Sequence, residues 1–240
     1  MPSAEARAEL TPRGKLRVAF PVASALYVVK DLATGNLSGV SIEIGKELAA
    51  RFGVPFETCP YPTVRDLIRA TDKDEWDLAT VVIEHEREAI LDFSAPYLEA
   101  DSTFLVVANS PVRNVPDADV AGLRIGVAER SAFDLFLTRT LKYASLVRYP
   151  GVTAAFEGFN AKENDAVAAP RPVLASALGK IASARILDDR FDVARAGIAM
   201  KKGRSPTGLG FVNAFIAEVI ASGWLNQAIE RTGIAGLRIA

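Results

Sequence analysis

The strongest indication of the fold is the sequence WDLATVVIEHEREAILDFSAPYLEADSTFLVV, residues 76–107. Its short apolar run Leu78–Val82 predicts a buried strand. A charged turn carrying Arg87 follows, and DFSAPY begins five residues after that arginine. The apolar residues 104–107 predict a second strand. The stretch therefore predicts two strands joined by a charged turn and a proline-containing hexapeptide.

The flanking sequence alternates between strand and helix patterns. Each half of the chain predicts the order strand, helix, strand, helix, strand, which is typical of mostly parallel sheets. Further strands are expected at residues 16–20, 55–58, 123–127, 146–149, 165–168, 185–187 and 194–200. Helices are expected after the capping residues Ser41, Thr63, Ser131 and Thr153, at Arg171–Leu178, and at residues 209–220 and 224–231.

The composition indicates a globular chain of balanced charge. The 240 residues are half apolar and carry a formal net charge of −1, so neither a nucleic-acid-binding face nor a polybasic membrane segment is expected. No apolar run approaches the roughly 18 residues of a membrane span. The single cysteine, Cys59, excludes an internal disulfide, and the single histidine, His85, argues against a His-rich metal site. Glycine-rich phosphate loops are absent, so no cofactor and no metal are expected.

The N-terminal residues MPSAEARAELTPRGK lack the apolar core and the small-residue cleavage site of a secretory signal. Two interpretations stay open. Either a signal peptide was removed and Met1 added, which would place the protein in the periplasm, or the chain begins here naturally and stays in the cytoplasm.

Residues 76–107 resemble the bacterial extracellular solute-binding proteins of family 3, the polar amino-acid receptors of ABC importers. That family has a strand ending in Ser or Thr, an E-R-K-like turn, D-F-S-x-P-Y and a strand that leaves the domain. The likeness continues over nearly the whole chain. LRVAFPVASALYVVKDLATGNLSGVSIEIGKELAARFG resembles the opening strand, ligand loop and first helix, and GLRIGVAERSAFDLFL the opening of the second domain. NDAVAA and GLGFVNAFIAEVIASGWLNQAIERTG resemble a later strand and the closing helices.

The resemblance implies an α/β, two-lobed fold of the type II periplasmic-binding-protein kind, with two mixed sheets flanked by helices and joined by a two-strand hinge. We expect residues 1–102 and 197–240 to form lobe 1 and residues 103–196 to form lobe 2. The tail after about residue 197 is expected to pack on lobe 1. Solutes bind between such lobes, which close by hinge bending.

The resemblance also implies a role for Arg87, because the arginine of that turn binds a ligand carboxylate in this family. A guanidinium offers a planar fork of donors that matches such a group. The residues alone leave an alternative open, in which Arg87 is a surface arginine paired with Glu84 or Glu88.

Ser131 and Ala132 stand where the family has a Thr/Ser pair at a helix N-terminus, whose free amides and dipole favour an anion. Ser131 also suits a plain helix cap, and the two roles are compatible. Arg130 replaces the usual small residue of this turn. It either adds positive charge to the cleft or points into solvent.

The departures from the family concern the ammonium group of an amino-acid ligand. Family receptors hold that group with acidic side chains, and two of those positions are Pro21 and Pro170 here. Arg171 follows Pro170 and is either a second anion contact or a solvated helix-terminal arginine. An ammonium without acceptors carries a desolvation penalty, so an ordinary α-amino acid is not the expected ligand.

Smaller departures affect the aromatic and hydroxyl contacts. The family's aromatic platform falls at Ser24, with Tyr27 as a substitute that packs on the ligand body. The hydroxyl position five residues before Arg87 is Val82, while Thr80 keeps the hydroxyl seven residues before it. The carboxylate contacts are thus partly kept.

We therefore predict a non-enzymatic, monomeric protein that binds a small anionic or polar solute, a carboxylate, and works with an ABC permease. One alternative is a lyase resembling cyclohexadienyl dehydratases, which share this fold, with Glu84, Glu129 or His85 as the acid in the cleft. Another alternative is a cytoplasmic ligand-responsive protein of the same fold.

Overall fold

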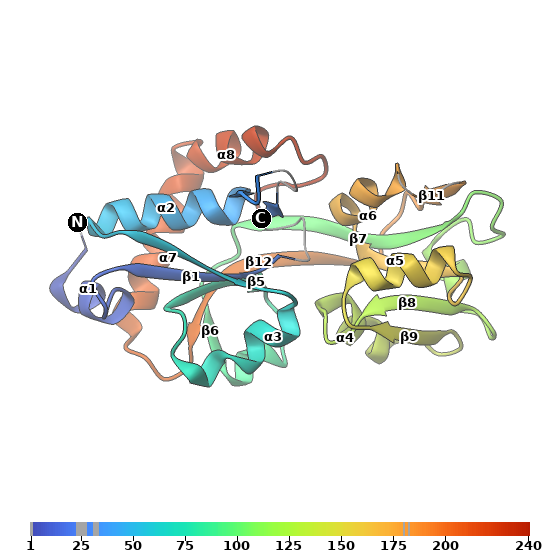
Figure 1. Cartoon of the computed structure of the whole chain (residues 1–240), viewed down its shortest axis with the longest axis horizontal. Helices are drawn as coiled ribbons and strands as arrows, with labels where there is room; N and C mark the ends of the chain where they lie inside the picture. Colours follow the sequence, from blue (N-terminus) through green and yellow to red (C-terminus); the bar gives the residue numbers. More distant parts are fainter. Residues whose placement is uncertain (1, 23–27, 31–33, 180, 182) are drawn as a thin grey trace. The chain divides into compact units, whose positions relative to one another are not determined.

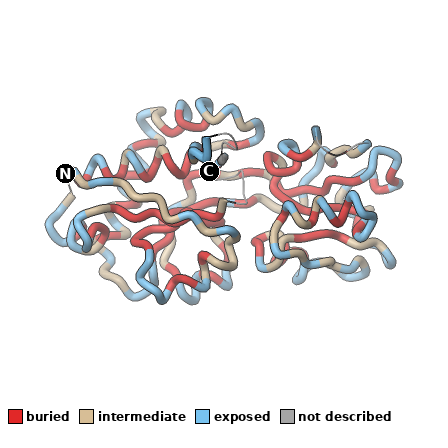
Figure 2. Tube along the Cα trace, viewed as in Figure 1, coloured by how far each residue is buried: buried red, intermediate tan, exposed pale blue. Residues whose placement is uncertain are grey.

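The computed structural model describes residues 2–22, 28–30, 34–179, 181 and 183–240, which form two compact units. Unit 1 comprises Met1–Val22, Tyr27–Glu99 and Arg195–Ala240, and unit 2 contains Ala100–Ala194. The chain passes from one unit to the other within strand β7 (Leu98–Val107) and returns within strand β12 (Asp192–Lys201). Each unit has its own buried residues along its strands (Figure 2).

The part of the ten-stranded sheet that belongs to unit 1 is mixed. Strand β1 (Leu16–Pro21) is parallel to both β4 (Phe56–Tyr61) and β5 (Leu78–Val82). β12 runs antiparallel to β5 and also to the short strand β6 (Leu91–Phe93). Both β1 and β5 are buried along their whole length, as expected for central strands covered on two faces.

Two helices cover opposite faces of this sheet (Figure 1), α2 (Val40–Phe52) and α3 (Val64–Arg69). The C-terminal helix α8 (Trp224–Thr232) packs on α2, and α7 (Pro206–Ala221) packs on the N-terminal helix α1 (Ala4–Leu10). A small antiparallel ribbon, β2 (Val29–Lys30) with β3 (Leu37–Ser38), and the 3₁₀ turns Thr71–Lys73 and Arg87–Ala89 complete unit 1. The tail after β12 therefore belongs to unit 1.

Unit 2 repeats the layered plan. β8 (Arg124–Ala128) is parallel to β9 (Ser145–Tyr149) and to β10 (Ala166–Pro170), while β7 runs antiparallel to β10 and to β11 (Ala184–Ile186). Helix α4 (Ala132–Thr140) covers one face, and α5 (Val152–Asn160) and α6 (Arg171–Leu178) cover the other. The 3₁₀ turn Val115–Ala118 follows β7.

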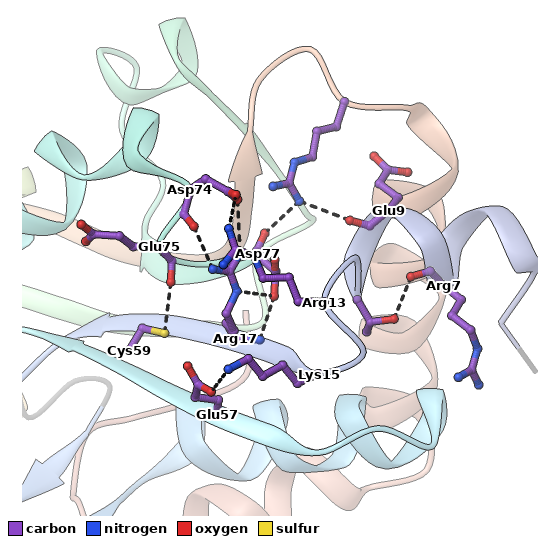
Figure 3. Close-up of polar contacts among 12 residues, drawn as sticks. Arg7, Glu9, Arg13, Lys15, Arg17, Glu57, Cys59, Asp74, Glu75 and Asp77 are labelled. Carbon is purple, nitrogen blue, oxygen red and sulfur yellow. Dashed lines mark hydrogen bonds and ion pairs between the residues drawn. The ribbon is translucent and has the colours of Figure 1, made fainter.

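In each unit, an arginine at the start of one strand pairs with the aspartate directly before a neighbouring strand, with the same geometry. In unit 1, Arg17 on β1 donates to Asp77 through its backbone N (2.9 Å), Nε (3.1 Å) and Nη2 (2.7 Å), as Figure 3 shows. In unit 2, Arg124 on β8 donates to Asp165 in the same way at 2.9, 3.0 and 2.9 Å. Asp77 is fully buried, whereas the Arg124 and Asp165 side chains are each 42% exposed. The shared element order of the two halves thus extends to individual contacts.

The expected strands and helices are present, with boundaries shifted by a few residues. Two helix starts differ: α2 begins after Gly39 rather than after Ser41, and α5 begins after Gly151 rather than after Thr153. Gly39 has φ +128°, a conformation open to glycine, so the backbone itself makes the turn without a side-chain cap. The expectation for residues 1–15 contained no helix, but α1 forms there with Ser3 as its cap.

Across the part of the chain that is described, no single helix has the length and apolar character needed to cross a membrane. Only α7 and α8 taken together pass that test, and a bend of 77° separates them.

Candidate functional site

Arg87 lies just beyond the C-terminal end of β5, in a turn closed by its backbone N–H donating to the Glu84 carbonyl at 2.8 Å. Arg87 is only 5% exposed, so it does not have the surface position that the alternative interpretation gave it. The guanidinium Nη1 donates to the Val82 carbonyl at 2.7 Å. This bond orients the planar fork at the end of a central strand, the edge at which open α/β sheets bind ligands.

The other candidates in this turn differ in exposure. Glu84 is buried, whereas the His85 side chain is 93% exposed and its Nδ1 lies 3.3 Å from Glu88 Oε2. A solvated histidine beside a solvated carboxylate has an ordinary surface environment. His85 therefore lacks the enclosed setting in which imidazole acid–base chemistry is usually tuned.

Thr80 points to the α2 side of the sheet. Its hydroxyl lies with those of Ser41 and Tyr97 in a buried cluster in which none of the three finds a hydrogen-bond partner in good geometry. Burial raises the pKa of Tyr97 to about 12, although the neighbouring Ser41 and Thr80 hydroxyls act to lower it. These three groups form a hydroxyl cluster (Ser41, Thr80 and Tyr97) that links helix α2, strand β5 and the D-F-S-x-P-Y segment.

The D-F-S-x-P-Y segment is fastened to β12. Ser94 N donates to the Ile198 carbonyl at 2.8 Å, and Ile198 N donates to Ser94 Oγ at 2.9 Å. Tyr97 N donates to the Ala196 carbonyl at 2.9 Å. A Cβ added to Gly197 would lie 3.1 Å from Ile83 and 3.3 Å from the Ser94 carbonyl. The motif therefore holds the segment before β7 against β12, a role that the resemblance alone did not assign.

In unit 2, Ser131 caps α4 by accepting a hydrogen bond from Asp134 N at 3.1 Å. Asp134 is 3% exposed, and it accepts from Arg130 N at 2.8 Å and from Arg148 Nε at 3.0 Å. Arg130 has φ +60°, a left-handed conformation that suits the small residue usual in this turn, and its side chain is exposed. Ala132 opens the helix and is buried.

At the start of α6, a proline stands where the resembled family has an acidic side chain for the ligand's ammonium group. Pro170 is the N-cap residue, and it supplies no side-chain hydrogen bond. Arg171 donates through Nη2 to the carbonyls of Asp188 (2.8 Å) and Asp189 (3.3 Å), which ties α6 to the segment before β12. Pro21 ends β1 and is buried.

Six of the candidates form one group in each unit, while Arg171 stands apart at the start of α6. Thr80, Val82 and Arg87 share one strand and turn of unit 1, and Arg130, Ser131 and Ala132 share one turn of unit 2. Ser24 and Tyr27 lie outside the described residues. In the described part of the chain, no cluster of three or more His, Cys, Asp or Glu side chains could hold a metal ion.

Comparisons with known proteins agree with this arrangement. The sequence model of the bacterial extracellular solute-binding proteins, family 3, matches residues 16–232. The chain is 25% identical over 198 residues to a glutamine-binding protein of Geobacillus stearothermophilus, covering 81% of this chain and 75% of that protein. It is 23% identical over 184 residues to the ABC transporter glutamine-binding protein GlnH of Bacillus subtilis (strain 168), covering 75% of this chain and 67% of the relative.

Solved structures share the fold. The amino acid ABC transporter substrate-binding protein AbpA of Streptococcus pneumoniae, bound to L-arginine, has a TM-score of 0.81 at 26% identity, over 93% of this chain and 96% of that one. The ancestral amino acid-binding protein AncCDT-1, a precursor of cyclohexadienyl dehydratase, has a TM-score of 0.79 at 24% identity, over 95% of this chain and 99% of that one. These likenesses confirm the mixed α/β, two-lobed periplasmic-binding-protein fold. With nine-tenths of its length matched by the family model, this chain belongs to the bacterial extracellular solute-binding proteins, family 3.

Proposed function

We propose that this protein captures a small carboxylate that lacks an α-amino group and delivers it to an ABC importer. The observation that carries the proposal is the buried Arg87 fork, which the Val82 carbonyl orients at the end of β5. A guanidinium can donate two parallel hydrogen bonds to a carboxylate. Because the bond to Val82 already orders this side chain, little conformational entropy is lost when the solute binds.

The proposal that the solute has no ammonium group rests on three positions whose side chains could have accepted from one: two are prolines, and the third is already engaged. Pro21 and Pro170 have no side-chain acceptor. Asp134, the acid in the first turn of α4, already accepts from Arg130 N and Arg148 Nε. An ammonium enclosed without acceptors costs several kcal/mol. Micromolar affinity amounts to only about 8 kcal/mol, so such a loss would remove it.

We further propose that the N-terminus of α4, with Ser131, Ala132 and the cationic Arg130, supplies additional donors to the same solute. Arg171 contributes positive charge at the start of α6, while Tyr27 and Ser24 are proposed to contact the body of the solute. In this proposal Val82 contacts the solute through its backbone, and Thr80 supports β5 from within the hydroxyl cluster. The functional lobes are proposed as residues 1–102 with 197–240, and residues 103–196.

The proposed partner and location follow from the relatives. GlnH and AbpA are named as components of ABC transporters, and the family is described as extracellular. We therefore propose an ABC permease as the partner and an exported, periplasmic location. We propose binding without catalysis, because His85 is solvated and the relatives in the sequence comparison are binding proteins.

Isothermal titration with matched pairs of solutes tests the proposal. Each pair differs only in the α-amino group: succinate with aspartate, glutarate with glutamate, glutaramate with glutamine, and 5-guanidinopentanoate with arginine. We expect the amino-free member to bind more tightly wherever a pair binds. Micromolar binding of glutamine, arginine or another amino acid, with weaker binding of its amino-free partner, would contradict the proposal.

A further inference from the structure

Unit 2 contains a second concave site, which the proposed function does not use. A cavity of about 450 Å³ lies between α4, the 3₁₀ turn Val115–Ala118 and the segment before β12. That volume is within the range of small-molecule sites. Every residue that lines the cavity belongs to unit 2, so the site depends on this unit alone.

Aromatic rings form the wall of this cavity. Phe191 lies between two other phenylalanines, with ring centroids 4.8 Å from Phe104 and 5.7 Å from Phe136. The Phe136 and Phe191 rings are nearly parallel, at 29°. Phe104 is buried in the core, whereas Phe136 and Phe191 are only partly covered. The partly covered rings leave apolar surface open to a ligand.

Carboxylates that the backbone holds in place stand beside these rings. Asp189 Oδ2 accepts from Val115 N at 2.7 Å, and Asp119 accepts from the backbone amides of Lys142, Tyr143 and Ala144. Although partial burial acts to raise it, these amides lower the pKa of Asp119 below its ordinary value. Backbone N–H groups therefore hold both carboxylates in place before any ligand binds.

The one cation lining the cavity is largely compensated. Arg190 Nη1 pairs with Asp101 Oδ1 at 2.8 Å, which offsets its charge. The cavity therefore combines a phenyl wall with a net acidic rim. Phenyl faces attract cations as well as apolar groups.

We propose that this cavity binds a small organic cation with an aromatic or branched apolar body, such as an arylalkylammonium. The apolar body packs against Phe136 and Phe191, and the ammonium lies toward Asp189 and Asp119. The rim disfavours an anion of the same shape, so this site selects a charge opposite to that of the solute proposed for Arg87.

Titration with 2-phenylethylamine and with 2-phenylethanol tests this site, because the two probes share a body and differ in charge. We expect the amine to bind about tenfold more tightly than the alcohol. Thr140, exposed at the cavity wall, allows a blocking substitution, and Thr140→Phe should abolish binding of the amine.

Asp189→Asn keeps an oxygen for Val115 N and removes the charge, so it should remove most of the preference for the amine. Asp117→Asn is the matched control, because Asp117 also caps backbone amides (Arg113 N at 2.8 Å, Asn114 N at 3.1 Å) but does not line the cavity. The proposal is overturned if the amine does not bind at about 10 mM, if both probes bind equally, or if Thr140→Phe leaves binding unchanged.

Discussion

Replacing Arg87 with alanine should weaken both solute binding and stability, by amounts that can be measured separately. A carboxylate that loses a charge-assisted hydrogen bond loses about 1.5–3 kcal/mol, or roughly ten- to a hundredfold in affinity. The same substitution removes the buried bond from Nη1 to the Val82 carbonyl. That bond stabilises the fold by about 1.5–3 kcal/mol, and a chain of this size loses roughly 2–4 °C in Tm per kcal/mol.

The assay is isothermal titration with the protein's own solute, at a temperature well below the Tm of the variant. Arg185→Ala is the matched control, because that guanidinium donates to the carbonyls of Ala108, Ser110 and Val112 and has no proposed contact with the solute. It should lower the Tm without changing affinity. Arg87→Lys, which keeps the charge but loses the fork, should bind with intermediate affinity. Unchanged affinity in Arg87→Ala would refute the role of Arg87.

Three further predictions concern the buried polar groups and the enzymatic alternative. Asp77→Ala removes the buried partner of Arg17, which keeps only the exposed Asp74 at 3.2 Å, and should lower the free energy of unfolding in urea by up to about 3–5 kcal/mol, whereas Asp165→Ala, at the exposed equivalent pair, should cost about 1 kcal/mol or less. Burial raises the pKa of Tyr97 from its ordinary value near 10 to about 12, so the folded state holds this proton more tightly than the unfolded state. The stability that results is complete below pH 10 and decreases as the pH rises toward 12. In urea titrations, Tyr97→Phe should abolish that part of the decrease. Incubation with prephenate or arogenate should give no aromatic product by ultraviolet absorbance, and turnover at a steady rate would establish the lyase alternative.

Local patterns in the sequence predicted most of the fold. Apolar runs located β5 without error, and Ser131 and Thr63 cap their helices as expected. Helix α1 was missed because only Ala6 and Leu10 of its residues are buried, and the helix packs on α7, about 200 residues away in sequence. Such a short helix depends on tertiary contacts that local periodicity does not reveal.

The candidate site was harder to predict than the fold. The resemblance located Arg87, but its burial and its bond to Val82 depend on how the turn folds back on β5. The sequence contained a signal for the Arg17–Asp77 pair, because Arg124 and Asp165 hold equivalent positions in the second half of the chain. That equivalence becomes visible only when the strands of the two units are compared in the structure. The cavity beside Phe191 brings together segments from four parts of unit 2, so no local motif could have indicated it.

Identification of the natural solute is the most direct test of whether Arg87 binds a carboxylate that lacks an α-amino group. The purified protein should be denatured without prior dialysis, and the released small molecules identified by mass spectrometry and then returned to solute-free protein for titration. We predict a carboxylate without an α-amino group, whose affinity falls at least about tenfold in Arg87→Ala. Release of an α-amino acid that rebinds with micromolar affinity would contradict it.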